Sequence, residues 1–203
     1  MENKTRLNYL IKIALLGALG GVLMLMKAPL AIFPNFLTID LSDIPAIIGA
    51  LVLGPIAGVL VEVMKILINF ILNGSFTGGV GELANLLIGI SLVLPIGLIY
   101  KKYSHVKGAV IGGIIGTISM TLMGALLNYF VLLPLYANLM NMEVMDFVYQ
   151  AEQIKIFGSL MNTEWDLVLF GITPFNIFKG LLLTTVTALL YRFVIPPLMR
   201  IQN

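Results

Sequence analysis

The chain has 203 residues and a mass of 22.1 kDa; 59% of its residues are hydrophobic and 11% are charged, where soluble domains have about a quarter charged. Its mean hydropathy is +1.02, and this composition excludes a soluble protein. The chain has no cysteine and one histidine, His105, which excludes disulfides and thiolate metal sites and leaves little acid–base chemistry. The formal net charge of +2 carries little information, because in a membrane protein the distribution of Lys and Arg matters more than their sum.

We expect an all-α, polytopic membrane protein with six transmembrane helices, in which residues 1–203 form a single transmembrane domain. Apolar stretches of about 20 residues are long enough to cross a bilayer as helices. The third of the predicted segments is shorter than this and ends at a Gly-rich turn. The predicted spans are Leu7–Met26, a second from a cap at Ser42 or Asp43 to Glu62, Lys65–Leu72, Glu82–Tyr100, Gly108–Pro134 and Pro174–Arg192.

Two connecting segments differ in composition from the spans. Residues 28–41 are apolar without helical periodicity and are interrupted by Pro29 and Pro34, which predicts a loop at a membrane face that can act as a lid. Residues 137–166 contain most of the acidic side chains of the second half of the chain. This composition predicts an extramembrane, amphipathic and partly helical segment.

The distribution of basic residues predicts that both termini are cytoplasmic. With six spans and both termini inside, eight Lys and Arg residues near span ends fall on the cytoplasmic side, and only Lys27 and Lys155 oppose the arrangement. This asymmetry follows the positive-inside rule and places the acidic segment outside the cell. The eight residues are Lys4, Arg6, Lys12, Lys101, Lys102, Lys107, Arg192 and Arg200.

Polar residues inside the predicted spans are the candidates for function, since an ionisable group in a span costs about 2.5 to 3.5 kcal/mol. Lys179 is the only charge inside the sixth span, and Asn176 lies on the same helical face. Asn128 on the fifth span, and Glu82 with Asn85 on the fourth, fall in the same outer half of the bilayer. Two alternatives remain open: Lys179 could reach the membrane interface, and the asparagines could make structural hydrogen bonds between helices.

The sequence lacks the motifs of the common catalytic sites. It has no phosphate-binding G-x-x-x-x-G-K-[ST] loop and no H-E-x-x-H zinc motif, and His105 lies in a predicted cytoplasmic turn. We therefore expect a binding protein and not an enzyme. We expect no metal, no cofactor and no nucleic-acid partner.

Four sequence segments are distinctive. They are Leu37–Pro45 (LTIDLSDIP), Gly54–Gly58 (GPIAG), Asn128–Tyr136 (NYFVLLPLY) and Pro174–Gly180 (PFNIFKG). These segments resemble the riboflavin-specific substrate-binding components of energy-coupling factor (ECF) transporters, and the resemblance extends over nearly the whole chain.

The resemblance implies a fold, a location and partners. It implies six helices in the bacterial plasma membrane, a site open to the extracellular side, and a complex with the transmembrane coupling subunit EcfT and two cytoplasmic ATPases. It also implies that the chain captures riboflavin for ATP-driven uptake. The expected substrate-binding residues are Thr38, Asp40, Glu82, Asn85, Asn128, Asn176 and Lys179, with the loop that carries Thr38 and Asp40 covering the site.

A second motif in the first span concerns the partner subunit. Ala14-Leu-Leu-Gly-Ala18 resembles the Ala-x-x-x-Ala pattern by which such components dock their coupling subunit. Small residues one turn apart make a strip that admits another backbone. Without the resemblance, packing inside the protein would be the better explanation for Ala14 and Ala18.

The polar residues suit a flavin. An isoalloxazine ring has an apolar edge and a pyrimidine edge with alternating donors and acceptors, which carboxamides and an ammonium group can match. Phosphate calls for arginine, and no arginine falls in the outer half, so riboflavin is favoured over its phosphorylated forms. The alternatives are a binding component for another vitamin, such as thiamine or biotin, and a small autonomous facilitator or channel.

Overall fold

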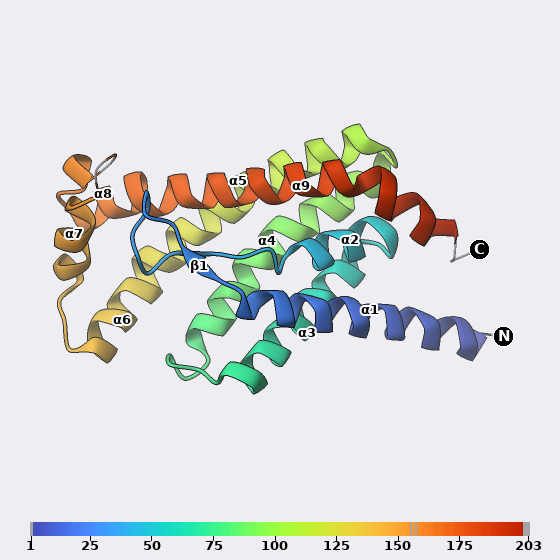
Figure 1. Cartoon of the computed structure of the whole chain (residues 1–203), viewed down its shortest axis with the longest axis horizontal. Coiled ribbons are helices and arrows are strands. Elements are labelled where there is room, and N and C mark those ends of the chain that lie inside the picture. The colour runs from blue at the N-terminus through green and yellow to red at the C-terminus, as the bar shows by residue number, and fades with distance from the viewer. Residues whose placement is uncertain (1, 155, 157, 201–203) are drawn as a thin grey trace.

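The computed structural model describes residues 2–154, 156 and 158–200 and is an elongated bundle of helices (Figure 1). Residues 2 and 200, the first and last described, lie at the same end of the bundle. Lys155, which the sequence placed on the outer side, lies outside the described residues. The elements are α1 (Glu2–Leu25), β1 (Ala28–Pro29), β2 (Thr38–Ile39), α2 (Ile44–Val52), α3 (Pro55–Asn73), α4 (Val80–Lys102), α5 (Val106–Leu127), η1 (Asn128–Leu132), α6 (Leu133–Met140), α7 (Val144–Glu152), η2 (Gly158–Leu160), α8 (Glu164–Asp166), η3 (Leu167–Ile172) and α9 (Thr173–Arg200).

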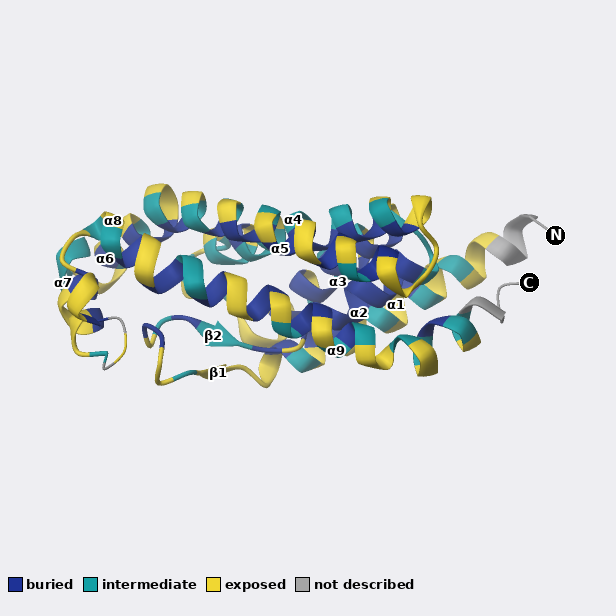
Figure 2. Ribbon diagram, turned by 90° about the horizontal axis from the view of Figure 1, so that it is seen from above, coloured by how far each residue is buried: buried dark blue, intermediate teal, exposed yellow. Residues whose placement is uncertain are grey.

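Five helices of the described residues are long and apolar enough to cross a membrane. They are Arg6–Leu25, Pro55–Asn73, Val80–Lys102, Val106–Met140 and Glu164–Leu198. Their outward faces carry exposed large apolar side chains, among them Leu15, Ile71 and Leu122 (Figure 2). Exposed leucine and isoleucine on every side of a bundle are typical of contact with lipid.

The predicted boundary between the second and third spans is wrong. The helix breaks at Gly54 and not between Glu62 and Lys65, because Gly54 has a φ of 104° and Pro55 begins the next helix. The short segment predicted at 65–72 is therefore the second half of α3. Its predecessor α2 has nine residues, about 14 Å at 1.5 Å per residue, which is less than half of the hydrocarbon thickness.

The segment between α1 and α2 lies in line with the short helix α2 along the bundle (Figure 1). It contains an antiparallel pair, β1 with β2, in which Pro29 lies opposite Thr38. This loop runs along the half of the bundle away from the termini, and α2 fills the other half (Figure 1). Loop and α2 together thus extend beside the long helices.

The last two long helices extend beyond their predicted ends at Pro134 and Pro174. Helical structure is continuous from Val106 to Met140 and from Glu164 to Arg200, and each run contains a π-helical segment that ends two residues before its proline. At 35 residues apolar enough to span, each is about 50 Å long, which exceeds the hydrocarbon thickness of a bilayer of about 30 Å. Their projecting ends carry α7, which confirms the partly helical segment predicted within 137–166.

Glycines set the close approach of α5 to its neighbours. A Cβ atom on Gly116 would lie 2.4 Å from the Leu92 carbonyl oxygen of α4, and one on Gly124 would lie 2.7 Å from the Asn176 amide nitrogen of α9. Backbones without side chains between them pack closely, as is common in membrane helices. The contact at Gly124 also brings α5 and α9 together at the site described next.

Candidate ligand-binding site

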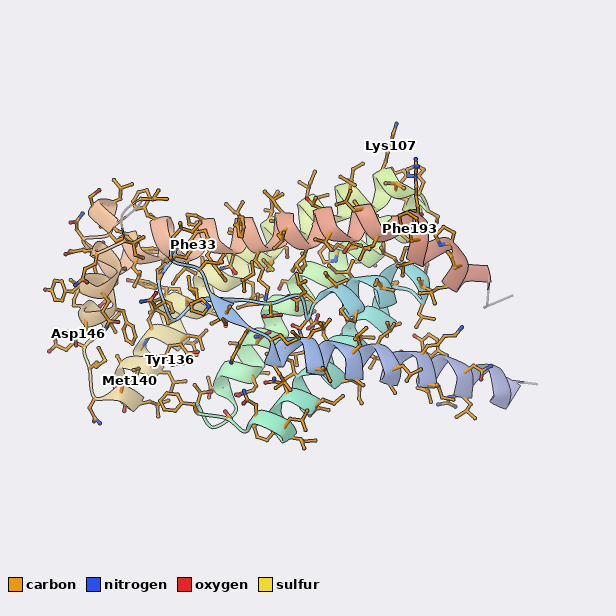
Figure 3. The ribbon with its side chains drawn as sticks, in the orientation of Figure 1. Phe33, Lys107, Tyr136, Met140, Asp146 and Phe193 are labelled. Carbon is orange, nitrogen blue, oxygen red and sulfur yellow. The ribbon has the colours of Figure 1, made fainter. Side chains whose placement is uncertain are left out.

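A cavity of about 400 Å³ lies in the half of the bundle away from the termini. Its volume is in the range of pockets for small organic ligands. Side chains from α1, the β1–β2 loop, α3, α4, η1, α6 and α9 line it, so every pass of the chain near this end contributes. Tyr136 of α6 lies at the end of the molecule opposite Lys107 (Figure 3).

The structure brings the predicted polar residues together. Six of the seven line this one cavity: Thr38, Glu82, Asn85, Asn128, Asn176 and Lys179. The seventh, Asp40, is not among the lining residues and lies behind Lys179, with its Oδ2 atom 3.4 Å from the Lys179 Nζ atom. Residues from four separate parts of the sequence thus line one cavity.

Asn128 and Asn176 present acceptors to the cavity. The Asn128 amide nitrogen donates to the Gly124 carbonyl at 2.7 Å, and the Asn176 amide nitrogen donates to the Ile172 carbonyl at 3.1 Å. Each bond lies within its own helix and fixes the side chain, which leaves the amide oxygen as an acceptor and the second amide N–H as a donor. Both side chains are buried. A ligand donor that pairs with them therefore strengthens binding, and a ligand donor left unpaired there weakens it.

Lys179 is a buried charged donor at the cavity. It is buried, so it does not reach the membrane interface, and its Nζ atom lies 3.1 Å from Asp43 Oδ2 in addition to its contact with Asp40. An ammonium group has three donors. Two carboxylates use two of them and leave one for the cavity.

Glu82 holds the Gly-rich turn that lines one part of the cavity. It accepts hydrogen bonds from the hydroxyls of Ser75, at 2.7 Å, and Thr77, at 3.2 Å. The bonds fix the turn between α3 and α4, which the sequence predicted at residues 73–81. Glu82 thus stabilises this turn in addition to lining the cavity.

Aromatic contacts hold the β1–β2 loop over the cavity. Phe33 packs edge-on against Phe175 of α9 with ring centroids 5.4 Å apart, and Phe36 packs edge-on against Phe147 of α7 at 5.7 Å. Phe36, Leu37 and Thr38 of this loop line the cavity. The loop therefore has the position of a lid, as its composition predicted.

The comparison with protein families agrees with this architecture. The model of the substrate-specific component of ECF transporters matches residues 8–191. The chain belongs to this family.

Individual members and a solved structure support the assignment. The chain is 34% identical to the riboflavin transporter FmnP of Bacillus subtilis strain 168, over 90% of this chain and 89% of that protein. It is 37% identical to the riboflavin transporter RibU of Staphylococcus aureus strain TCH60, over 95% of each. A solved S component of a bacterial ECF transporter is 37% identical, with a TM-score of 0.71 over 95% of this chain and 96% of that one.

Membership in the ECF family settles the class of function. The family is the substrate-specific part of a transporter, so this chain is a membrane transport component and not an enzyme. Its apolar helices agree with this class.

Several cavity residues of this S component escaped the sequence analysis. Asn69 and Asn73 of α3 line the cavity, as do Lys27, Phe36 and Tyr136. The signal for Asn69 was present, because it lies on the same face of α3 as Glu62 and Lys65. The sequence analysis missed this face because it placed Glu62 at the end of one span and Lys65 at the start of the next.

The two alanines of the first span lie on the surface of the ECF component. Ala14 and Ala18 are exposed, whereas Gly17 and Gly21 face α3, where Cβ atoms would lie 2.4 Å from Met64 Cβ and 2.6 Å from Ile68 Cγ2. The close packing of α1 inside the protein thus uses its glycines. The alanines are left free for another surface.

Proposed function

We propose that this S component captures riboflavin on the extracellular side of the bacterial plasma membrane and delivers it for ATP-driven uptake. The observation that carries the proposal is the convergence of Asn128, Asn176 and Lys179 on one cavity. Two acceptors and a donor match the alternating polar edge of an isoalloxazine ring. Phe36, Leu132 and Phe175 supply apolar contacts for the rest of the ring. The relatives named riboflavin transporters support the same ligand.

We further propose six membrane passes with both termini in the cytoplasm. The loop with α2 serves as one pass beside the five long helices, and an even number of passes agrees with termini at the same end of the bundle. Lys107 lies at that end (Figure 3), and Lys101 and Lys102 precede it in the same short stretch of sequence. The positive-inside rule makes it the cytoplasmic end. The cavity then opens toward the outside.

The proposed partners are the coupling subunit EcfT and two cytoplasmic ATPases. Family membership supports an ECF complex, and the chain itself carries no phosphate-binding loop. The energy for uptake must then come from another subunit. The exposed strip of Ala14 and Ala18 is the proposed contact with EcfT.

The proposal is tested by titrating the detergent-purified protein with riboflavin and following flavin fluorescence. We expect saturable quenching at one site per chain, and a yellow preparation when the host supplies the vitamin. Thiamine and biotin should leave the signal unchanged. Displacement of riboflavin by either vitamin, or flux of riboflavin through liposomes that contain this chain alone, would contradict the proposal.

We also expect weaker binding of flavin mononucleotide than of riboflavin. None of the described residues that line the cavity is an arginine; of its two lysines, Lys27 and Lys179, the second is already paired with two carboxylates, and Glu82 adds a negative charge. A phosphate brings up to two negative charges, so we expect its dissociation constant to be about tenfold higher or more. Competition against radiolabelled riboflavin measures the ratio. Displacement by equal concentrations of the two flavins would refute this expectation.

A further inference from the structure

A buried ion pair in α3 has no part in the site as described so far. Glu62 and Lys65 are fully buried, and the Lys65 Nζ atom lies 2.6 Å from Glu62 Oε2. Neither residue lines the cavity. Charges inside a membrane span are costly and mark functional positions by default.

Glycines of two neighbouring helices enclose the pair. A Cβ atom on Gly20 of α1 would lie 3.2 Å from Lys65 Cγ, and one on Gly89 of α4 would lie 2.5 Å from Glu62 Oε2. A side chain at Gly20 or Gly89 would therefore crowd Lys65 or Glu62. The neighbouring helices accommodate the pair because both of these positions are glycine. The pair occupies a site that the bundle is shaped to hold.

The pair connects to the cavity through Asp43. Asp43 binds Lys65 with its Oδ1 atom and Lys179 with its Oδ2 atom, the latter at 3.1 Å. Asp40 similarly accepts from the backbone N–H of Ser42 at 2.8 Å with Oδ1 and lies near Lys179 with Oδ2. In each carboxylate that contacts Lys179, the other oxygen is therefore bound by a second partner, Lys65 for Asp43 and Ser42 for Asp40.

We propose that Lys65 is a positioning residue that, through Asp43, aims the Lys179 ammonium at the ligand. The inference rests on the proposed function, because it concerns how that ligand is bound. While Lys65 holds one Asp43 oxygen, only the other is available to Lys179, and the third Lys179 donor stays free for the cavity. Without Lys65, both Asp43 oxygens can turn to Lys179. The ammonium is then drawn away from the ligand.

A double-mutant cycle tests whether Lys65 acts through Lys179. Riboflavin dissociation constants are measured for the unmodified protein, Lys65→Met, Lys179→Met and the double variant. We expect Lys65→Met alone to weaken binding about tenfold, equivalent to about 1.4 kcal/mol. In the Lys179→Met background the same change should alter the constant by less than about twofold, since coupled residues are not additive. An equal loss in both backgrounds would overturn the proposal, because a general packing defect does not need Lys179.

Two further variants separate positioning from loss of structure. Asp43→Asn keeps the shape of the bridge and removes the carboxylate through which Lys65 acts, so in the Asp43→Asn background the Lys65→Met change should alter the riboflavin constant by less than about twofold; a tenfold loss there would overturn the proposal, even if Lys65→Met alone unfolds. Glu62→Gln changes the charge of the same buried site without cutting the path from Lys65 to Lys179, and should bind riboflavin within about twofold of the unmodified protein. Thermal unfolding in detergent checks that each variant is folded. A Glu62→Gln loss as large as that of Lys65→Met would overturn the proposal.

The controls distinguish this inference from the proposed function. Lys12→Met makes the same substitution on α1 outside the ion network and should leave the dissociation constant unchanged. Failure of the unmodified protein to bind riboflavin would refute the proposed function and this inference with it. Binding by the unmodified protein, together with unchanged binding by Lys65→Met, would refute this inference alone.

Discussion

Replacement of Lys179 by methionine should raise the riboflavin dissociation constant by about one to two orders of magnitude. The lost bond is one from a charged donor to a buried ligand group, and such bonds contribute about 1.5 to 3 kcal/mol. Asn176→Ala removes a neutral partner and should cost about 1 to 3 kcal/mol, since it leaves a buried ligand group unpaired. Flavin fluorescence quenching with the purified variants gives both constants.

The ion network changes what else these variants should do. Lys179 contacts both Asp40 and Asp43, so its removal leaves two buried carboxylates with one cation fewer, and part of the protein's stability is lost as well. Asn176 has only a bond to its own helix. Asn176→Ala should therefore insert and fold like the unmodified protein, which makes it the cleaner test of the site.

Matched controls use the same side chains away from the cavity. Lys107→Met at the opposite end and Asn138→Ala on the exposed side of α6 should leave the riboflavin constant unchanged. Thermal unfolding reports separately on stability. Normal affinity in both Lys179→Met and Asn176→Ala would mean that the ligand lies elsewhere.

The polar cluster was predictable because it follows from helical periodicity and depth. Asn176 and Lys179 lie one turn apart, and Asn128 lies at a similar distance from the outer end of its own helix. Sequence alone can place such residues on a face and at a depth. It cannot give the rotation of each helix, which decides that all three residues line one cavity.

The charges of α3 were misplaced because their partners lie elsewhere in the chain. Taken alone, Glu62 and Lys65 suggest span ends, since unpaired charges do not stay in lipid. The structure shows that Asp43, 22 residues before Lys65, neutralises it inside the bundle. No local pattern contains that contact.

The extended helices were missed for a different reason. Pro134 and Pro174 suggested a helix end and a helix start, because proline lacks an N–H and crowds the preceding turn. The structure continues through both prolines with a π-helical segment before each. Such segments occur mainly as single turns within α-helices and often at functional sites, and here the first begins at the cavity residue Asn128.

Substitution of Ala14 or Ala18 by tryptophan should separate capture of the vitamin from its uptake. Both alanines are exposed, so tryptophan has room in the isolated protein, and neither residue lines the cavity. Riboflavin binding should therefore stay within about twofold of the unmodified protein. Association of helices in lipid depends on close packing of small residues, so the added bulk should prevent docking of EcfT.

Uptake by cells should fall to near the background of cells without the transporter, because the chain depends on its partners for energy. The measurements are a riboflavin titration of each purified variant, cellular uptake, and co-purification of EcfT. Leu19→Trp is the control: it is exposed on α1 but lies about 100° from Ala18 around the helix axis. It adds the same bulk without covering the strip and should support uptake. Loss of riboflavin binding together with uptake would mean that Ala14 and Ala18 serve the fold, and normal uptake with co-purified EcfT would mean that the coupling subunit docks on another face.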